Sequence, residues 1–420
     1  MKKTHQSHSS RNLDEWLSYL ENIHSTEIDM GLERISKVAQ KLAINFEFTQ
    51  VITVAGTNGK GTTCAFLENT LLAEQHSVAV YSSPHIEKFN ERLRINKQDV
   101  DDTAFILAFE HIEQTRGDIS LTYYEYTTLA ALLIMMAEKP NYAILEVGLG
   151  GRLDATNIID ADIAVITTVD LDHQAFLGDN RESIGFEKAG IMREGQRVVI
   201  GDKLPPKSVL THAQQLNTQV YLRGVDFNVD LLNFENRWCW QSQNNTFNNL
   251  PQPSIPRDNI ATAIMVLELL GVTLDEKKLV SLIASTKVAG RTERIAGHCK
   301  IMLDVGHNPL AARYLVEQIA LLSATKVHAV VAMLADKDIL NTLTPLIYSV
   351  DCWYLASLDV PRGANAAQLE CHLSNNANQL LTFDNVIDAY KMALSQAKES
   401  DLILVFGSFF TVAQVKSFIK

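Results

Sequence analysis

The chain has 420 residues, of which 46% are hydrophobic and 20% charged, the composition of an ordinary globular protein. At roughly 100–200 residues per domain this length predicts two or three domains. Lys and Arg total 37 against 49 Asp and Glu, so the formal net charge is −12. Nucleic acids and anionic membranes bind basic surfaces, and we therefore expect neither as a partner. An anionic small substrate is compatible with this charge if its pocket is locally basic.

The N-terminal segment and the cysteines predict a cytoplasmic protein. Residues 4–10 are all polar and supply no apolar segment of the kind that a secretion signal needs. The longest apolar run, at residues 129–137, is shorter than the roughly 20 residues of a membrane-spanning helix. The five cysteines are widely spaced and form no C-x-x-C pair, which indicates free thiols in a reducing compartment.

In the first half of the chain, short β-branched runs alternate with longer helical patterns. This alternation is typical of βαβ units around a parallel sheet, so we expect a doubly wound α/β fold. The predicted strands are residues 51–55, 78–82, 142–147, 163–169 and 197–200, and the predicted helices include 62–74 and 126–138.

The second half starts with a change of composition. Residues 221–256 are rich in Asn, Gln and Trp and have weak periodicity, which predicts an antiparallel excursion or a surface ribbon before a helix that begins near Asn259. A second α/β series follows, and a Gly-containing charged stretch at 289–298 indicates a domain boundary. The strands predicted in this series are residues 301–305, 328–333, 353–355 and 402–406.

The strongest local motif is Gly-Thr-Asn-Gly-Lys-Gly-Thr-Thr at residues 56–63, directly after a predicted strand and before a predicted helix. A phosphate-binding loop needs this context, because backbone N–H groups and the helix N-terminus face the anion. Lys60 would reach the β- and γ-phosphates, and Thr62 would be a ligand of Mg²⁺. Gly61 separates these two residues, a departure from the common G-x-x-x-x-G-K-[ST] loop. The alternative interpretation is a Gly-rich turn with a solvated lysine.

Three polar residues lie at or just beyond the ends of predicted strands: Ser83, Glu146 and His173. The carboxyl ends of parallel strands line the ligand crevice of an open sheet, so these side chains are expected to converge beside the phosphate loop. Their oxygen and imidazole donors predict a site for Mg²⁺, with Mn²⁺ as the alternative. Taken singly, the serine also fits a turn, the glutamate a structural ion pair and the histidine a helix cap.

Four further residues are candidates for the same chemistry. Lys188 lies in a semi-apolar stretch, where desolvation favours a neutral, reactive amine, although a solvated helical lysine is the more ordinary interpretation. Arg291 would clamp a phosphate or carboxylate, or else belong to a surface linker. Asp304 and His307 close a predicted strand of the second series, and the histidine is also a candidate cap of the following helix.

Together these segments resemble the bifunctional dihydrofolate synthase/folylpolyglutamate synthases, a family of the Mur ligase superfamily. The resemblance runs from about Trp16 to near the C-terminus and implies two α/β domains. Residues 1–295 would form a P-loop-type, mostly parallel sheet domain with the pterin pocket, and 296–420 a smaller Rossmann-like domain that contributes to ATP and glutamate binding. The most specific stretches are 54–64, 81–85, 121–126, 144–157, 182–191, 304–308 and 333–338, with Gly407 and Ser408.

The resemblance also implies a role for individual residues. The residues that would bind ATP are Thr57, Asn58, Gly59, Lys60, Gly61, Thr62, Asn259, Arg291 and Asp304. The metal ligands would be Ser83, Glu146 and His173. The dihydropteroate pocket would contain Ile28, Asp29, Met30, Thr122, Tyr123, Tyr124, Glu125, Leu153, Asp154 and Ala155. The catalytic residues would be Lys60, Lys188, as a carbamylated lysine that helps to position a second metal ion, and His307, which would position glutamate or handle a proton.

The implied reaction is ATP-dependent amide formation between L-glutamate and dihydropteroate or a reduced folate such as tetrahydrofolate, through an acyl phosphate. ATP and one or two Mg²⁺ ions would be required, and we expect a monomer. The alternatives are a folylpolyglutamate synthase alone, another Mur-type ligase, or a P-loop nucleotide switch without ligase chemistry. Ala175, Thr292 and Phe410 depart from the family pattern and affect the expected adenine and glutamate contacts rather than the reaction type.

Overall fold

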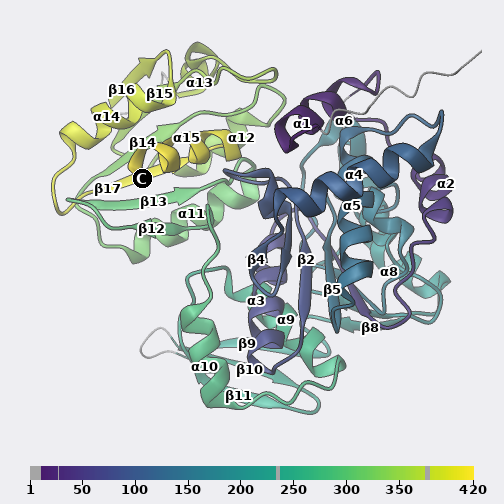
Figure 1. Ribbon diagram of the computed structural model, residues 1–420. Helices are drawn as coiled ribbons and strands as arrows, with labels where there is room; N and C mark the ends of the chain where they lie inside the picture. The colour runs from purple at the N-terminus through teal and green to yellow at the C-terminus, as the bar shows by residue number, and fades with distance from the viewer. Residues whose placement is uncertain (1–10, 27, 233–236, 374–378) are drawn as a thin grey trace, which may run out of the picture.

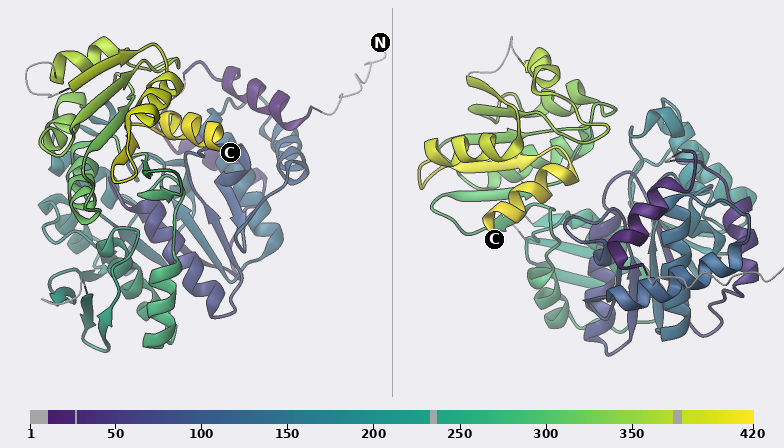
Figure 2. Two further views of the ribbon diagram at one scale, coloured as in Figure 1. Left: turned by 90° about the vertical axis from the view of Figure 1, so that its left-hand side faces the viewer. Right: turned by 45° about the horizontal axis from the view of Figure 1, so that its top comes forward.

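The computed structural model describes residues 11–26, 28–232, 237–373 and 379–420. The polar segment at residues 4–10 lies outside this part of the chain. None of the helices described is both long and apolar enough to cross a membrane. Two α/β units lie side by side, each built on its own sheet, and they are joined by the segment after helix α10 (Glu276–Ser285) (Figures 1 and 2).

The first unit contains an eight-stranded sheet in the order β4-β3-β2-β5-β1-β6-β7-β8. Six of its strands are parallel, and only β3 and β4, at one edge, run antiparallel to their neighbours. The strands are β1 (Gln50–Ala55), β2 (Val78–Tyr81), β3 (Leu93–Ile95), β4 (Gln98–Asp99), β5 (Tyr142–Glu146), β6 (Ile163–Ile166), β7 (Arg197–Ile200) and β8 (Gln219–Leu222).

Helices cover both faces of this sheet because its central strands alternate apolar side chains to the two sides. Val78 and Val80 of β2 contribute to the core on one face, and Ala79 and Tyr81 to the core on the other. The helices and single-turn 3-10 helices of this unit are α1 (Leu13–Asn22), α2 (Glu33–Lys41), α3 (Lys60–Ala73), η1 (Phe89–Arg92), α4 (Asp102–Arg116), α5 (Tyr123–Glu138), η2 (Ala155–Ile158), α6 (Gln174–Leu177), α7 (Arg181–Ala189), α8 (Lys207–Gln215), α9 (Arg257–Leu269) and α10.

The predicted antiparallel excursion is confirmed. It is a three-stranded sheet of β9 (Phe227–Leu232), β10 (Arg237–Ser242) and β11 (Thr246–Leu250). Two fully buried tryptophans, Trp238 and Trp240, join this sheet to the core beneath it, and the indole N–H of Trp240 donates to the carbonyl oxygen of Ala261 in α9 at 3.0 Å. The excursion therefore holds in place the helix that carries Asn259.

The second unit is a six-stranded sheet in the order β12-β13-β17-β14-β15-β16, parallel except for β12. Helices α11, α12 and α13 cover one face, and α14 and α15 the other. The elements are β12 (Glu293–Ile295), β13 (Lys300–Asp304), α11 (Pro309–Leu321), β14 (Val327–Val331), α12 (Ile339–Leu343), η3 (Thr344–Leu346), β15 (Cys352–Ala356), α13 (Ala366–Leu373), β16 (Gln379–Phe383), α14 (Val386–Gln396), β17 (Leu402–Phe406) and α15 (Phe409–Ile419).

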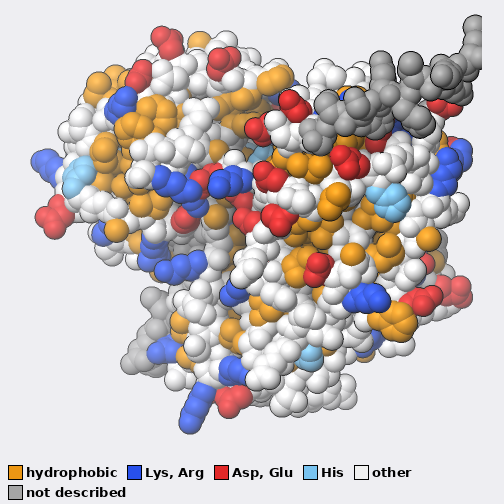
Figure 3. All heavy atoms as spheres, in the orientation of Figure 1, with side chains coloured by type: hydrophobic (Ala, Val, Ile, Leu, Met, Phe, Trp, Pro, Cys, Tyr) orange, Lys and Arg blue, Asp and Glu red, His pale blue; other side chains and the backbone are white. Residues whose placement is uncertain are grey.

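The predicted fold class, a mostly parallel α/β domain followed by a second α/β domain, is confirmed. The exact division of the chain at residue 296 stays a prediction, and β12, just before it, pairs with β13. Acidic and basic side chains meet along the boundary between the two units in Figure 3. Between the units, the Lys416 ammonium of α15 lies 3.9 Å from Glu87 of the first unit, and it is paired at 2.8 Å with Glu293 of its own unit.

Candidate active site

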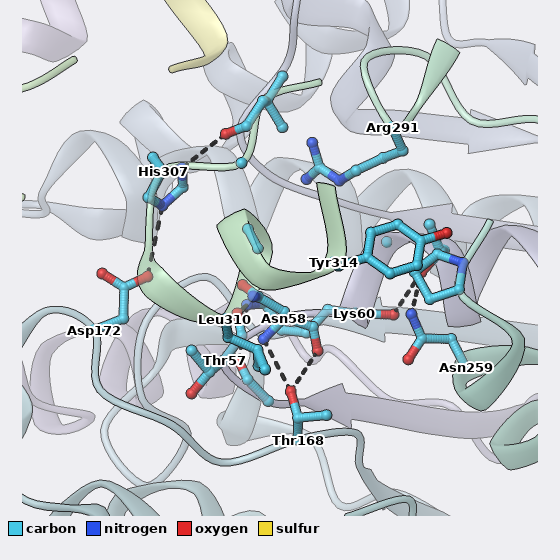
Figure 4. Close-up of a pocket in the computed structure, with 18 of the residues that line it drawn as sticks. Thr57, Asn58, Lys60, Thr168, Asp172, Asn259, Arg291, His307, Leu310 and Tyr314 are labelled. Carbon is cyan, nitrogen blue, oxygen red and sulfur yellow. Dashed lines mark hydrogen bonds and ion pairs between the residues drawn. The ribbon is translucent and has the colours of Figure 1, made fainter. Parts of the chain in front are cut away.

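A cavity of about 430 Å³ lies where the two units meet (Figure 4). The carboxyl ends of β1, β2, β5 and β6 reach it from the first sheet and the end of β13 from the second, which is where open parallel sheets bind ligands. All the residues that the sequence predicts to bind ATP, to bind the metal or to take part in catalysis line this cavity. They are Thr57, Asn58, Gly59, Lys60, Gly61, Thr62, Ser83, Glu146, His173, Lys188, Asn259, Arg291, Asp304 and His307.

The phosphate-loop motif forms the turn between β1 and α3. Gly59 has φ +89°, and a Cβ there would lie 2.4 Å from the Asn259 side-chain oxygen, so both the backbone conformation and the space require glycine. The ammonium of Lys60 donates to the Gly56 carbonyl oxygen at 2.9 Å. Burial lowers the pKa of Lys60, opposed by the charges of Glu146 and Asp172. The loop thus offers free backbone N–H groups and one partly buried cation to an anion at the start of α3.

Asn259 connects the phosphate loop to α9. Its side-chain amide donates to the Thr62 hydroxyl at 2.8 Å, and that hydroxyl in turn donates to the Gly59 carbonyl oxygen at 3.0 Å. These contacts fix the turn from a helix nearly 200 residues further along the chain. Asn259 thus lies beside the phosphate loop, and its role in ATP binding stays a prediction.

The three predicted metal ligands face the same cavity. Glu146 is 5% exposed, and burial raises its pKa while the charges of Lys60 and Arg291 lower it. A Cβ at Gly61 would lie 3.5 Å from a Glu146 carboxylate oxygen, an ordinary contact distance, so the phosphate loop passes directly beside this carboxylate. His173 follows β6 in a left-handed conformation, with φ 50°, and its Nε2 lies 3.3 Å from the Lys337 ammonium.

These donors fit a hard divalent cation that completes its shell with water and phosphate. A buried carboxylate, a hydroxyl and an imidazole beside a phosphate loop are sufficient for such an ion, because Mg²⁺ keeps several waters and substrate oxygens. Within the described ranges, no three His, Cys, Asp or Glu side chains are arranged to hold a metal ion by themselves. The assignment of Ser83, Glu146 and His173 as metal ligands stays a prediction.

Lys188 projects from α7 and is 4% exposed. Burial, together with the nearby charge of Lys60, lowers the pKa of Lys188 to about 7. Its amine has no hydrogen-bond partner among the described residues. Burial at this position is the setting for which the semi-apolar sequence context predicts a neutral, reactive amine, and the catalytic role of Lys188 stays a prediction.

The second unit supplies a cation, an anion and an imidazole. Asp304 accepts hydrogen bonds from the backbone N–H groups of Thr292 (2.8 Å) and Gly306 (2.7 Å) at the end of β13. The Arg291 guanidinium lies 5.0 Å from the ring centroid of Phe409; burial lowers the pKa of this arginine and the charge of Asp304 raises it. His307 is bound through Nδ1 to the Val305 carbonyl oxygen at 2.9 Å.

The predicted role of His307 as a helix cap is wrong. Asn308 caps α11 instead, because its side-chain oxygen accepts from the Ala311 backbone N–H at 3.0 Å. This leaves the His307 ring free to turn toward the first unit, where its Nε2 lies 3.5 Å from an Asp172 carboxylate oxygen (Figure 4).

Asp172 is a residue that the sequence analysis missed. Three side chains of the second unit contact its carboxylate: His307, Asn308 (3.1 Å) and Lys337 (2.8 Å). Although burial raises the pKa of Asp172, hydrogen bonding and charge from His307 and the charge of Lys337 hold it well below the usual range. Asn58 of the phosphate loop also lies 2.9 Å from Asn308. The second unit is therefore held directly on the nucleotide loop.

We expect Asp172→Ala to weaken the contact between the two units by about 2–4 kcal/mol, because it leaves the largely buried Lys337 ammonium without its anion. The activity that the resemblance implies, glutamate-dependent ADP release, should fall by at least about tenfold in kcat/KM, and limited proteolysis between the units should become faster. Asp160→Ala, which removes an exposed carboxylate paired only with Arg193, is the matched control. Unchanged activity and proteolysis in the Asp172 variant would contradict this account.

The residues predicted for the pterin pocket do not line the cavity; they lie beside it, around the Gly-rich turn after β5. Tyr124 donates to Asp154 at 3.4 Å, and Asp154 accepts from the backbone N–H of Gly148 at 3.0 Å. On the outer side, Arg34 bridges Asp29 (2.7 Å) and Glu125 (3.2 Å). The remaining predicted members are Ile28, Met30, Thr122, Tyr123, Leu153 and Ala155, of which Thr122 and Ala155 are buried.

Comparisons with known proteins agree with this arrangement. The model of the Mur ligase middle domain matches residues 54–228, and that of the Mur ligase glutamate ligase domain matches residues 290–409. The chain is 46% identical to the dihydrofolate synthase/folylpolyglutamate synthase of Escherichia coli over 416 residues, covering 99% of this chain and 97% of that protein. The corresponding protein of Haemophilus influenzae is 44% identical, with 96% of each chain covered.

Solved structures give the same result. The E. coli FolC structure in complex with DHPP and ADP superposes with a TM-score of 0.93 at 44% identity, covering 99% of each chain. A bifunctional folylpolyglutamate synthase/dihydrofolate synthase from Yersinia pestis, complexed with AMPPNP and Mn ion, gives a TM-score of 0.92 at 44% identity, again over 99% of each chain. The chain belongs to the dihydrofolate synthase/folylpolyglutamate synthase family of Mur ligases.

Proposed function

We propose that this protein is an ATP-dependent ligase that adds L-glutamate to dihydropteroate, giving dihydrofolate, and to reduced folates, giving folylpolyglutamates. The observation that carries the proposal is the single cavity lined by the phosphate loop of one unit and by Arg291, Asp304 and His307 of the other. Relatives of this chain bear both activities in their names, and solved relatives hold ADP or AMPPNP, Mn and L-glutamate.

The first step activates a carboxylate, which by itself is a poor acyl donor. A carboxylate oxygen of the acceptor attacks the γ-phosphorus of ATP, the bond to the β-phosphate oxygen breaks, and an acyl phosphate and ADP result. Lys60 lies at the loop that would hold these phosphates, and its charge stabilises the transferred phosphoryl group. A divalent cation held by Ser83, Glu146 and His173 would neutralise phosphate charge.

In the second step the amine of L-glutamate attacks the acyl carbon, the bond from that carbon to the phosphate oxygen breaks, and the amine loses a proton. The site must exclude water, which would hydrolyse the acyl phosphate. The contacts of Asp172 with His307, Asn308 and Lys337 support a role in holding the second unit closed during this step. His307 lines the cavity, and its Nε2 lies 3.5 Å from Asp172. We assign it to positioning L-glutamate or to handling a proton of its amine.

The proposed organisation of the protein covers its domain boundary, its acceptor pocket, its oligomeric state and its location in the cell. We place the boundary between an ATP-binding domain with the pterin pocket and a C-terminal domain at residue 296, and the acceptor pocket around Tyr124 and Asp154. We propose a monomer as the active unit, because the two units of one chain together supply the phosphate loop and Arg291, Asp304 and His307. Its five free cysteines support a reducing, cytoplasmic location.

The test is ADP release by the purified protein with ATP, Mg²⁺ and L-glutamate, measured separately with dihydropteroate and with tetrahydrofolate. We expect glutamate-dependent ADP release with each acceptor, and its loss on chelation of the metal. Turnover of tetrahydrofolate alone would reduce the function to folylpolyglutamate synthesis. If the protein turns over neither acceptor but releases ADP with a cell-wall nucleotide precursor, the chain is another Mur-type ligase.

A further inference from the structure

Arg92, the last residue of η1, is a buried arginine without an acidic partner. It is 8% exposed, and its Nε donates to the Nδ1 of His85 at 3.0 Å. No described Asp or Glu forms an ion pair with it. Arg94, on the same edge of the sheet, pairs with Glu68 at 3.1 Å. A largely buried charge is costly unless an anion compensates it, so an anionic ligand at the Arg92 guanidinium would be stabilising.

Aromatic rings fix the orientation of this guanidinium. Its central carbon lies 5.8 Å from the ring centroid of Phe89 and 5.5 Å from that of Tyr123, distances at which a cation is attracted to a ring face. Its two terminal nitrogens have no acceptor among the described residues. The fork geometry of these nitrogens matches the two oxygens of a carboxylate.

His85 adds a second donor. Its Nδ1 accepts the hydrogen bond from Arg92, so in the neutral ring the hydrogen is on Nε2. No described atom accepts from that nitrogen. A guanidinium fork and an imidazole N–H side by side, within an aromatic enclosure, form an anion-binding site suited to a carboxylate rather than to a cation.

The site formed by Arg92 and His85 lies next to the cavity, close to the predicted acceptor pocket. His85 follows Ser83 and Pro84, both of which line the cavity, in the same loop after β2. Tyr124 follows Tyr123 in the chain, and its hydroxyl packs against Gly148, a residue that lines the cavity. A Cβ at Gly148 would lie only 2.6 Å from the Tyr124 hydroxyl oxygen. Arg92 therefore lies beside the predicted acceptor pocket, where its guanidinium packs against Tyr123.

The two proposed acceptors differ in the number of their carboxylates. Dihydropteroate has one, and the reaction converts it into an amide. A reduced folate ends in glutamate, which has two; whichever of them reacts, the other keeps its charge. We propose that Arg92 and His85 bind the non-reacting carboxylate of the terminal glutamate of a folate substrate. Arg92 is then a specificity-determining residue for polyglutamate extension and not for dihydrofolate synthesis. This inference rests on the proposed function.

The first experiment compares both acceptors in Arg92→Gln. We expect kcat/KM for tetrahydrofolate to fall about 100-fold, chiefly through a higher KM, and kcat/KM for dihydropteroate to change less than about threefold. Arg92→Lys, which keeps the charge without the fork, should recover part of the loss. Arg94→Gln is the matched control, since it should change both acceptors by the same factor. Equal losses with both acceptors in Arg92→Gln would overturn the inference.

A second experiment leaves the protein unchanged. The wild-type enzyme is assayed with a reduced folate in which the non-reacting carboxylate of the terminal glutamate is replaced by a carboxamide. We expect about the same 100-fold loss. Arg92→Gln should show no further loss with the amide. Equal turnover of acid and amide by the wild-type enzyme would overturn the inference even if the variant fails to fold. Failure of the wild-type enzyme with both acceptors would instead reject the proposed function and, with it, this inference.

Discussion

Lys60→Ala is expected to lower ADP release by about 1000-fold or more, with little change in the stability of the fold. Lys60 is the first residue of α3, and its ammonium lies within the turn that would hold the β- and γ-phosphates, bonded to the Gly56 and Thr57 carbonyl oxygens at 2.9 and 3.3 Å. During phosphoryl transfer, negative charge shifts toward the leaving phosphate oxygens, and a partly buried, preorganised cation stabilises that charge more strongly than water does.

The measurement is single-turnover ADP formation with saturating acceptor, which separates phosphoryl transfer from product release. Lys203→Ala, which removes an exposed lysine outside the cavity, should release ADP at the wild-type rate. Thermal unfolding of the Lys60 variant should stay within a few degrees of the wild-type midpoint. Near-wild-type ADP formation in this variant would contradict the assignment of the phosphate loop.

The parallel topology explains why so much of the site could be predicted from the sequence. Ser83, Glu146 and His173 are 63 and 27 residues apart along the chain, yet each lies at or just after the end of a strand. Once β2, β5 and β6 are parallel members of one sheet, their ends must lie along one edge, so position relative to a strand was enough to bring these residues together.

Local backbone details were less predictable, because polar side chains override hydrophobic periodicity. Helix α5 begins at Tyr123, three residues before the predicted start, since Thr122 and Glu125 form a capping box. The strand predicted at residues 163–169 ends at Ile166. Beyond it, the Thr167 hydroxyl donates to the Asn58 carbonyl oxygen at 2.6 Å, which binds this segment to the phosphate loop.

Contacts between the two units had no signature in the sequence. Lys337 and Asp172 are separated by 165 positions and lie in different units, so their 2.8 Å contact depends on how the two sheets face each other. No periodicity or motif spacing encodes that arrangement. Strand β16 was also missed: its burial is only partial, and an edge strand of this kind lacks the continuous apolar run of the central strands.

Lys188→Ala is expected to lower glutamate-dependent ADP release by about 100-fold or more. The buried amine has a pKa of about 7, so a large share of it is neutral near pH 7.5 and able to attack CO₂. A new bond then joins the nitrogen to the carbon, one proton is released, and the lysine becomes a carboxylate inside the cavity. In the family that the chain belongs to, we expect this group to help position a second cation; alanine supplies no donor there.

The dependence on pH distinguishes this modification from a purely structural lysine. Below pH 7 the amine is mostly protonated and does not react with CO₂, so wild-type activity should decline between pH 8 and pH 6 and recover when bicarbonate is added. Lys188→Ala should lack this bicarbonate response, and acetate or formate, small enough to occupy the vacated space, should restore part of its activity. Intact-mass measurement in CO₂-saturated buffer supplies the direct readout. If the intact mass shows no added CO₂ and bicarbonate does not change the wild-type activity, then Lys188 acts as an unmodified amine.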